Sequence, residues 1–281
     1  MKPLLHPRTK QQLDRFIASP KNGLILQGES GAGKSYVAQW LAEQVLERSI
    51  ESDPYVFVIN GSDSGIDEVR ALQKKLSLHV PGSGVIRRVV IFEHFDKFRH
   101  EAQNALLKTL EEPPLDTLLI PTISDKQAVL STIHSRLPQL LVRPVSYDEA
   151  MAYSSDKTKA ERAYHLSGGA AGLFIALLAD DTAHPLTKGV VRAKELLAQE
   201  KYMRLASIDA LLKDKENDYK LVLDGMARLL SASYAGARAA KKSSTVLRQH
   251  QRRLDTMMQA LHDLNSGVHQ KLVLTRLFLA L

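Results

Sequence analysis

The sequence predicts an α/β domain built on a parallel sheet and followed by an all-helical region. Up to about residue 145, short apolar runs alternate with segments whose apolar residues recur at helical spacing. This alternation is typical of a parallel sheet that helices cover on both faces. One strand-to-helix connection is rich in glycine. After residue 145 the strand patterns stop and amphipathic segments take their place.

Five strands and three helices are expected in the first part. The strand runs are 23–28, 54–61, 87–92, 116–124 and 137–145. The helical runs are 35–49, 65–78 and 102–114. The third helix stops at a pair of prolines, because proline lacks the backbone N–H that a helix interior needs.

The second part is expected to contain helices alone. Residues 146–185 indicate a small helical unit, and longer amphipathic helices follow to the end of the chain. The predicted plan is an α/β domain at 1–145, a small helical lid at 146–185 and a helical domain at 186–281.

Composition restricts the function classes. The 281 residues include 44% hydrophobic residues, which suits a normal core, and no cysteine, which excludes disulfides and thiolate metal sites. No apolar run approaches the roughly 20 residues of a membrane helix, and the N-terminus lacks a secretory signal, so a cytoplasmic location is expected. The formal net charge of +7 is compatible with a polyanionic partner such as nucleic acid.

The glycine-rich connection carries the clearest motif. The octapeptide GESGAGKS, which begins at Gly28, matches the phosphate-binding pattern G-x-x-x-x-G-K-[ST]. Gly28, Gly31 and Gly33 let backbone N–H groups curl around phosphates. Lys34 is expected to reach the β- and γ-phosphates and Ser35 to offer its hydroxyl to Mg²⁺. A strand before it and a helix after it support nucleotide binding.

Charged residues follow directly on the strand 87–92. Glu93 is placed to hold the Mg²⁺ shell through water. The next position is where a general base would polarise water, and it holds His94, which accepts a proton only as neutral imidazole. We interpret His94 as a structural residue of a degenerate site, with a catalytic role as the alternative. Asp96 either assists the metal or, as we favour, caps the following helix.

Three further features have both functional and ordinary interpretations. Thr122, Ser124 and Asp125 end a strand, where one of them can contact the γ-phosphate or all can simply begin a polar loop. Arg136 lies on a loop or helix end and can stabilise transferring phosphoryl charge or be solvated. A basic cluster on the C-terminal helices is either a solvated face or a DNA contact; it comprises Lys241, Lys242, Arg248, Arg252 and Arg253.

Two stretches carry a resemblance to a known family. QNALLKTLEEPP, which starts at Gln103, and TIHSR, which starts at Thr132, resemble AAA+ clamp-loader subunits of bacterial DNA polymerase III. The delta-prime type is most similar and the gamma/tau type second. The likeness covers about the first 180 residues, and the tail from Leu264 is similar to the last helix of the family's collar domain.

The resemblance implies an AAA+ nucleotide-binding core, a helical lid and an oligomerising collar. It implies ATP and Mg²⁺ at the phosphate loop, with Glu93 at a position where the family usually has Asp. Arg136 matches an arginine finger that acts on the neighbouring subunit. The implied partners are gamma/tau and delta-type subunits, the sliding clamp, and primer–template DNA in the assembled complex.

The chain also departs from the family's pattern. The S-R-C motif reads Ser135-Arg136-Leu137, so the finger is kept and the cysteine is not. The family's four-cysteine zinc module is absent, and no zinc is expected. His94 replaces the second acid, and the lid motif at 168–174 reads GGAAGLF without an arginine.

The expected function is therefore a clamp-loader subunit that binds ATP, hydrolyses it weakly and donates Arg136 to a neighbour while the clamp is loaded onto primed DNA. Loss of a general base typically lowers a rate by about 10² to 10⁴. One alternative is an active gamma-like ATPase that uses His94 or Asp96. Another is a helicase-loader-like DNA-binding AAA+ protein outside the polymerase.

Overall fold

The computed structural model describes the residues in the ranges 3–78, 80–81, 84–214 and 218–281. The chain forms two compact units, Met1–Glu149 with Ala170–Gly172, and Ala150–Gly169 with Leu173–Leu281. The threefold division into 1–145, 146–185 and 186–281 stays a prediction.

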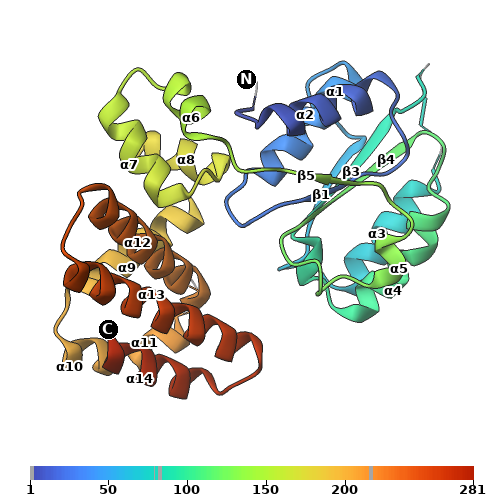
Figure 1. Ribbon diagram of the computed structural model, residues 1–281. Helices are drawn as coiled ribbons and strands as arrows, with labels where there is room; N and C mark the ends of the chain where they lie inside the picture. Colours follow the sequence, from blue (N-terminus) through green and yellow to red (C-terminus); the bar gives the residue numbers. More distant parts are fainter. Residues whose placement is uncertain (1–2, 79, 82–83, 215–217) are drawn as a thin grey trace. The chain divides into compact units, whose positions relative to one another are not determined.

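The first unit alternates strands and helices along the chain (Figure 1). Its strands are β1 (Ile25–Gln27), β2 (Val56–Asn60), β3 (Arg88–Glu93), β4 (Thr117–Ile123) and β5 (Gln139–Leu141). Its helices are α1 (Pro7–Ala18), α2 (Lys34–Leu46), α3 (Ile66–Leu76), the 3₁₀ turn η1 (Phe95–Lys97), α4 (His100–Glu111) and α5 (Ser131–His134). The first segment of this unit ends at Glu149, which lies within helix α6 (Tyr147–Tyr153).

The five strands form one parallel sheet in the order β2-β3-β4-β1-β5. The register pairs Leu26 of β1 with Thr122 of β4 and with Leu140 of β5. On the other side of β4, Ile91 of β3 lies opposite Ile120. The predicted fold class, a parallel α/β sheet followed by helices, is confirmed.

Helices cover both faces of the sheet (Figure 1). Val89 and Ile91 of β3 belong to the core cluster that includes residues of α1 and α2. Val90 and Phe92 belong to a second cluster with residues of α3, α4 and α5. Successive residues of one strand therefore enter opposite cores, as the two-residue period of a strand requires. This double burial explains the continuous apolar run that predicted β3.

Helix α1 is present although no helix was predicted there. The side chain of His6 accepts a hydrogen bond from the backbone N–H of Arg8, and Pro7 is the first helical residue. Proline suits this position because its missing N–H would have no intrahelical partner. Leu13 is fully buried against the sheet and anchors the helix.

The second unit contains helices and no strand among its described residues. They are α7 (Lys157–Ser167), α8 (Ala171–Leu178), α9 (Pro185–Ala198), α10 (Lys201–Ala206), α11 (Ile208–Lys213), α12 (Tyr219–Ala239), α13 (Ser244–Asn265) and α14 (Gln270–Ala280). The first two residues of α8 belong to the first unit. The first of the longer helices expected after residue 185, α9, ends before α10 because the backbone is extended at Gln199 and Glu200.

The apolar core of the second unit lies among α9 to α14. Leu223 and Met226 of α12, Met257 of α13 and Leu274 and Phe278 of α14 are fully buried in it. The long helices therefore pack through their apolar faces, as amphipathic spacing predicts.

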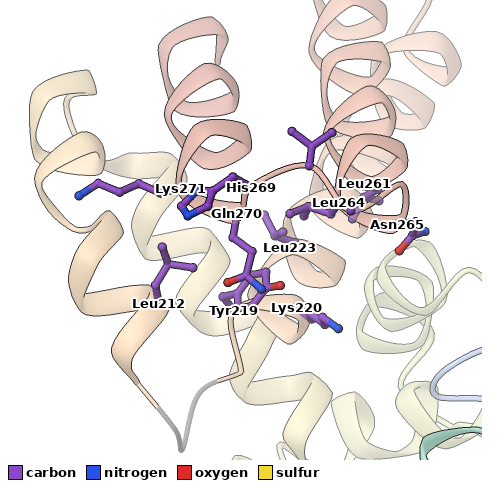
Figure 2. A pocket seen from close by; sticks show the side chains of 12 residues that line it. Leu212, Tyr219, Lys220, Leu223, Leu261, Leu264, Asn265, His269, Gln270 and Lys271 are labelled. Carbon is purple, nitrogen blue, oxygen red and sulfur yellow. The ribbon is translucent and has the colours of Figure 1, made fainter.

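A pocket of about 710 Å³ opens at one end of these helices (Figure 2). Leucine side chains from α11, α12 and α13 line it, and polar residues from the start of α14 lie beside them.

Tyr219 is one of the residues that line this pocket. Burial raises the pKa of its hydroxyl above the usual value, and neighbouring Asp218 acts in the same direction. No described helix of the chain is both long enough and apolar enough to span a membrane.

Candidate functional site

The strand order brings the predicted nucleotide-binding residues to one edge of the sheet. β4 lies between β1 and β3, and all three strands are parallel. The phosphate loop follows β1, Glu93 ends β3, and Ser124 directly follows β4. The carboxyl ends of parallel strands form the usual ligand-binding edge of such a sheet. The predicted site residues of these three segments therefore lie together at this end of the sheet. Arg136, which follows α5, is not among them.

The phosphate loop needs glycine at three positions. Gly31 and Gly33 have φ angles of 83° and 85°, a left-handed conformation that side chains disfavour. A Cβ atom on Gly28 would lie 2.8 Å from the carbonyl oxygen of Val142. Helix α2 begins at Lys34, within the phosphate motif, so its N-terminus adjoins the proposed phosphate position.

Lys34 is buried within the loop and fully hydrogen-bonded. Its Nζ donates to the carbonyl oxygens of Gly28 and Glu29 and to Ser124 Oγ, each at 2.9 Å. Burial lowers the pKa of Lys34 to about 8, against the opposing attraction of Asp96 and Glu29. If a nucleotide binds in this loop, its anionic phosphate oxygens would replace these neutral oxygens as partners of the Lys34 ammonium.

The end of β3 is held rigidly by packing and by backbone hydrogen bonds. Phe92 and Phe95, on either side of Glu93 and His94, are fully buried with ring centroids 5.7 Å apart. His94 has a φ angle of 49°, and its backbone N–H donates to Thr122 Oγ1 at 3.1 Å. Glu93 is half-buried, and its carbonyl accepts from the N–H of Gly61 at 2.8 Å.

His94 sits among both positive and negative groups. Burial lowers the pKa of its imidazole below the usual 6.5, and the cations Lys97 and Lys34 act in the same direction. Asp96 and Glu93 oppose this shift. A lowered pKa favours the neutral imidazole, in which one ring nitrogen is an acceptor.

Asp96 does not cap the following helix, so that prediction is wrong. The N-cap residue of α4 is Arg99, and the carboxylate of Asp96 instead accepts from the backbone N–H groups of Ser124 and Asp125, at 3.2 and 3.0 Å. The turn η1 directs Asp96 sideways to the neighbouring strand end. Its other oxygen, Oδ1, is buried and has no hydrogen-bond partner among the described residues.

The three polar residues at the end of β4 have different local partners. Thr122 is buried and bonds to the backbone of His94, whereas Ser124 bonds to Lys34. Asp125 is exposed, and its Oδ1 accepts from the N–H of Gln127 at 2.8 Å. Of the three side chains, Ser124 alone is bonded to the phosphate loop. Contact of Thr122 or Ser124 with a γ-phosphate stays a prediction.

Gly172 is a site residue that sequence reasoning did not identify. A Cβ atom there would lie 2.8 Å from the carbonyl oxygen of Gly31 and 2.9 Å from the nitrogen of Gly33. The segment Ala170–Gly172 therefore packs directly on the phosphate loop, within the first unit. The only sequence signal was the motif GGAAGLF, which drew attention through its missing arginine.

Arg136 lies at the opposite edge of the sheet from the phosphate loop. It precedes β5, whose first residue Gln139 pairs with Ile25, the first residue of β1. Its neighbour Leu137 occupies the space beside Gly23, just before β1. The phosphate loop leaves the other end of β1, so Arg136 is remote from the nucleotide site of its own chain.

The guanidinium of Arg136 is exposed at the end of α5, as predicted for a loop or helix end. It forms an ion pair with Glu111 at the end of α4 and donates to the carbonyl oxygen of Thr132. Both contacts lie on the surface, and the Glu111 side chain is 41% exposed. The guanidinium is accordingly available to an external anion.

The oxygen-bearing side chains beside the phosphate loop suit a magnesium ion that arrives bound to a nucleotide. They suit less well an ion that protein side chains alone would hold. Among the described residues, no cluster of three or more His, Asp or Glu could hold a metal. The hydroxyl of Ser35 and the carboxylates of Glu93 and Asp96 are oxygen donors, which Mg²⁺ prefers. The unpaired Oδ1 of Asp96 can accept from a metal-bound water.

Comparison with known proteins identifies the family. The model of the family described as DNA polymerase III, delta subunit, matches residues 5–146, about half of the chain. The chain belongs to this DNA polymerase III family. The matched region contains the phosphate loop, the end of β3 and Arg136.

Similar curated proteins support the same assignment. The chain is 29% identical over 177 residues to DNA polymerase III subunit delta' of Haemophilus influenzae, with 62% of this chain and 52% of that protein covered. It is 31% identical over 122 residues to the Escherichia coli delta' subunit, which covers 42% and 36% of the two chains. The chain thus matches about half the length of these relatives or less. The resemblance to the delta-prime type of clamp-loader subunit is confirmed.

A crystal structure that covers nearly the whole chain has a similar fold. It is the DNA polymerase III gamma subunit-related protein of Thermotoga maritima, with a TM-score of 0.53, 19% identity and 97% of each chain covered. At this identity the likeness concerns the fold alone. It includes the helical region as well as the α/β unit.

Proposed function

We propose that this DNA polymerase III family member is a clamp-loader subunit that binds ATP, hydrolyses it slowly and supplies Arg136 to the nucleotide of a neighbouring subunit. The observation that carries this proposal is the position of Arg136. It is exposed at the sheet edge opposite the phosphate loop of its own chain. An arginine in that place can act on a nucleotide only if another subunit presents one.

ATP binding is supported by the phosphate loop and its surroundings. The left-handed glycines Gly31 and Gly33 shape the backbone, and Lys34 has three oxygen partners that phosphate oxygens can replace. Ser35 and Glu93 would hold Mg²⁺ as it arrives with the nucleotide. Bound Mg²⁺ would supply charge neutralisation between the phosphates.

Slow hydrolysis is proposed from the end of β3. A carboxylate at the position of His94 would be anionic and would accept a proton from water. The neutral imidazole carries no negative charge, and its backbone is fixed by the buried hydroxyl of Thr122. Removal of a general base typically lowers a rate by about 10² to 10⁴ while binding through the loop persists.

The role of Arg136 in trans follows from its chemistry. A guanidinium is planar, permanently charged and has five donors, which suits it to transferring phosphoryl groups. Here an exposed carboxylate, Glu111, holds it on the surface. Association with a neighbour would exchange this carboxylate for the phosphates of the neighbour's ATP.

The partners are proposed from the family. Subunits of the gamma/tau and delta types would flank this chain, and the helical unit would serve as the oligomerising collar. The assembled complex would engage the sliding clamp and primer–template DNA.

The test is ATP binding and hydrolysis by the chain alone and mixed with a gamma-type subunit. We expect the chain alone to bind ATP and barely hydrolyse it, and the wild type to raise the partner's turnover while Arg136→Ala does not. An arginine finger is worth about 10³ to 10⁵ in rate. Arg15→Ala, at an exposed position of α1, is the matched control and should behave as the wild type. Equal stimulation by Arg136→Ala would refute the finger.

A second candidate is an active ATPase subunit, and the lowered pKa of His94 favours it. A neutral imidazole can accept a proton at pH 7, which is what a general base must do. In that case the isolated chain would turn over ATP at a substantial rate. Both Lys34→Ala and His94→Gln would then abolish this turnover, whereas the finger-donor function predicts little turnover to lose.

A further inference from the structure

The positive charge of the chain is confined to its second half. Residues 1–149 contain 18 Lys and Arg and 18 Asp and Glu, so this part is formally neutral. Residues 150–281 contain 20 basic and 13 acidic residues, which accounts for the whole net charge of +7. The α/β unit with its phosphate loop therefore contributes no net charge, and the helical unit contains the basic surface.

Within the helical unit the excess is concentrated further. No acidic residue occurs between Asp224 and Asp255, and this stretch contains seven Lys and Arg residues. Its charge equals that of the entire chain. One of the seven, Arg228, is paired with Asp224. The other six form what we call the basic α12–α13 surface: Arg238, Lys241, Lys242, Arg248, Arg252 and Arg253.

These six side chains are free to meet an external anion. All six residues are exposed, and none forms an ion pair or a side-chain hydrogen bond with another described residue. Elsewhere in the described chain, arginines commonly find a carboxylate, as Arg192 does with Glu195. An exposed cluster of like charge without counter-charges raises the local potential, which attracts polyanions.

The fold places four of the six cations at one end of a helical hairpin, and Arg252 and Arg253 follow further along α13. Helix α12 ends at Ala239 and α13 begins at Ser244, and the two helices pack side by side (Figure 1). Ser233 Oγ lies 3.3 Å from His250 Nδ1 across this contact. Arg238 and the two lysines therefore lie at the end of the hairpin that also bears Arg248.

The spacing of the arginines suits a phosphate backbone. Arg248 and Arg252 are one turn apart on α13, about 6 Å along the helix axis. Phosphates two nucleotides apart on one strand of B-DNA are separated by about 6.8 Å along the duplex axis. Exposed hydroxyl residues at the start of α13, Ser244 and Thr245, adjoin the lysines and are of the type that contacts phosphate oxygens.

The same surface is poorly suited to a protein partner. Residues 225–254, all of them described, include no exposed large apolar side chain, and their one aromatic residue, Tyr234, is half-buried. Specific protein interfaces have an apolar core enriched in aromatic residues. Aromatic side chains for stacking on bases are also missing, so recognition would concern the backbone and not the sequence.

We propose that the basic α12–α13 surface binds the phosphate backbone of nucleic acid without reading its sequence. This inference goes beyond the proposed function, because it requires neither the phosphate loop nor Arg136. It assigns a nucleic-acid contact to the helical unit itself.

The experiment measures binding of the full chain, without ATP, to a fluorescent DNA duplex and to the matching single strand, by anisotropy at salt concentrations of about 50 to 200 mM. The variant is Arg248→Gln/Arg252→Gln/Arg253→Gln. The control removes the same charge from exposed, unpaired lysines on α9 and α10, namely Lys188→Gln/Lys194→Gln/Lys201→Gln. Circular dichroism checks that both variants are folded.

Each lost phosphate contact should reduce the slope of log affinity against log salt by about 0.9 on duplex DNA, so the triple arginine variant should reduce it by about 2.7. On the single strand each lost contact should reduce the slope by about 0.7. Affinity at the lowest salt should fall at least about tenfold. The control should keep the wild-type slope. Equal slopes in both variants would overturn the proposal. So would competition by polyglutamate as effective as that by unlabelled DNA of equal charge, which would indicate an acidic protein partner.

Discussion

Lys34 donates a hydrogen bond to the hydroxyl of Ser124 at 2.9 Å, which links the start of α2 to the loop after β4. The same ammonium also bonds to two carbonyl oxygens of the phosphate loop. Three donors and three acceptors match, so a buried cation is tolerated. The partners are all neutral, however, and burial still lowers the pKa of Lys34 to about 8.

This pKa predicts how stability depends on pH. The pKa of Lys34 in the folded chain, about 8, is below its usual value of 10.5. Between these values the unfolded chain binds more protons, so the free energy of unfolding contributed by Lys34 increases with pH across this window. The total change is about 3 kcal/mol. Urea unfolding at a series of pH values would measure it.

Lys34→Met is the control for that measurement. It removes the titrating group, so its free energy of unfolding should lack the increase between about pH 8 and 10.5. If both proteins show the same pH profile, another group is responsible.

The hydrogen bond from His94 to Thr122 predicts a second effect. Thr122→Val keeps the shape of this buried side chain but leaves the N–H of His94 without its acceptor. An unpaired buried donor costs about 1–3 kcal/mol. Thr122→Ser keeps the hydroxyl and should be less destabilised than the valine variant. Chemical unfolding of both variants measures this difference, and a fully stable Thr122→Val would show that water replaces the bond.

The parts of the site that the sequence predicted are encoded locally. The phosphate loop is a contiguous motif, in which Gly31 and Gly33 have left-handed φ angles. The strand β3 is a continuous apolar run because both of its faces are buried. Arg136 was expected at a loop or helix end, and it follows the short helix α5. Short patterns were sufficient for these features.

The parts that were missed depend on contacts between distant segments. Asp96 bonds to the backbone of Ser124 and Asp125, and no local pattern distinguishes this from a helix cap. Gly172 packs against Gly33, although most of the sequence of the α/β unit lies between them. The sheet order, which decides that Arg136 and the phosphate loop lie at opposite edges, is likewise a property of the whole fold.

The contact of Gly172 with the phosphate loop predicts the effect of a single methyl group. In Gly172→Ala the new Cβ would lie 2.8 Å from the carbonyl oxygen of Gly31, so backbone must shift. Overpacking of this kind typically costs about 1–3 kcal/mol. Because the displaced segment is the phosphate loop, we expect ATP affinity, measured by calorimetry, to fall about tenfold.

Gly236→Ala is the matched control for this substitution. It lies within α12, and a Cβ there meets nothing within 4 Å. Alanine should stabilise this helix by about 0.5–1 kcal/mol and leave ATP binding unchanged. If Gly172→Ala binds ATP as tightly as Gly236→Ala does, the segment at Ala170–Gly172 moves away without disturbing the loop.

The ion pair between Arg136 and Glu111 allows the finger proposal to be tested without removing the arginine. Glu111→Gln should change the free energy of unfolding by less than about 1 kcal/mol, because the side chains of Arg136 and Glu111 are 32% and 41% exposed and the ion pair lies at the surface. It also removes the carboxylate that competes with phosphate for Arg136. We therefore expect stimulation of a gamma-type partner's ATPase to rise, by up to about fivefold for 1 kcal/mol.

The neighbouring Glu112, exposed and without an ion pair among the described residues, provides the control. Glu112→Gln should leave the stimulation unchanged. The double variant Glu111→Gln/Arg136→Ala decides the mechanism. If it keeps the increase seen with Glu111→Gln, the effect does not pass through Arg136 and the finger proposal fails. If the increase disappears, the two residues act as a pair in which Glu111 holds Arg136 until a neighbour's nucleotide replaces it.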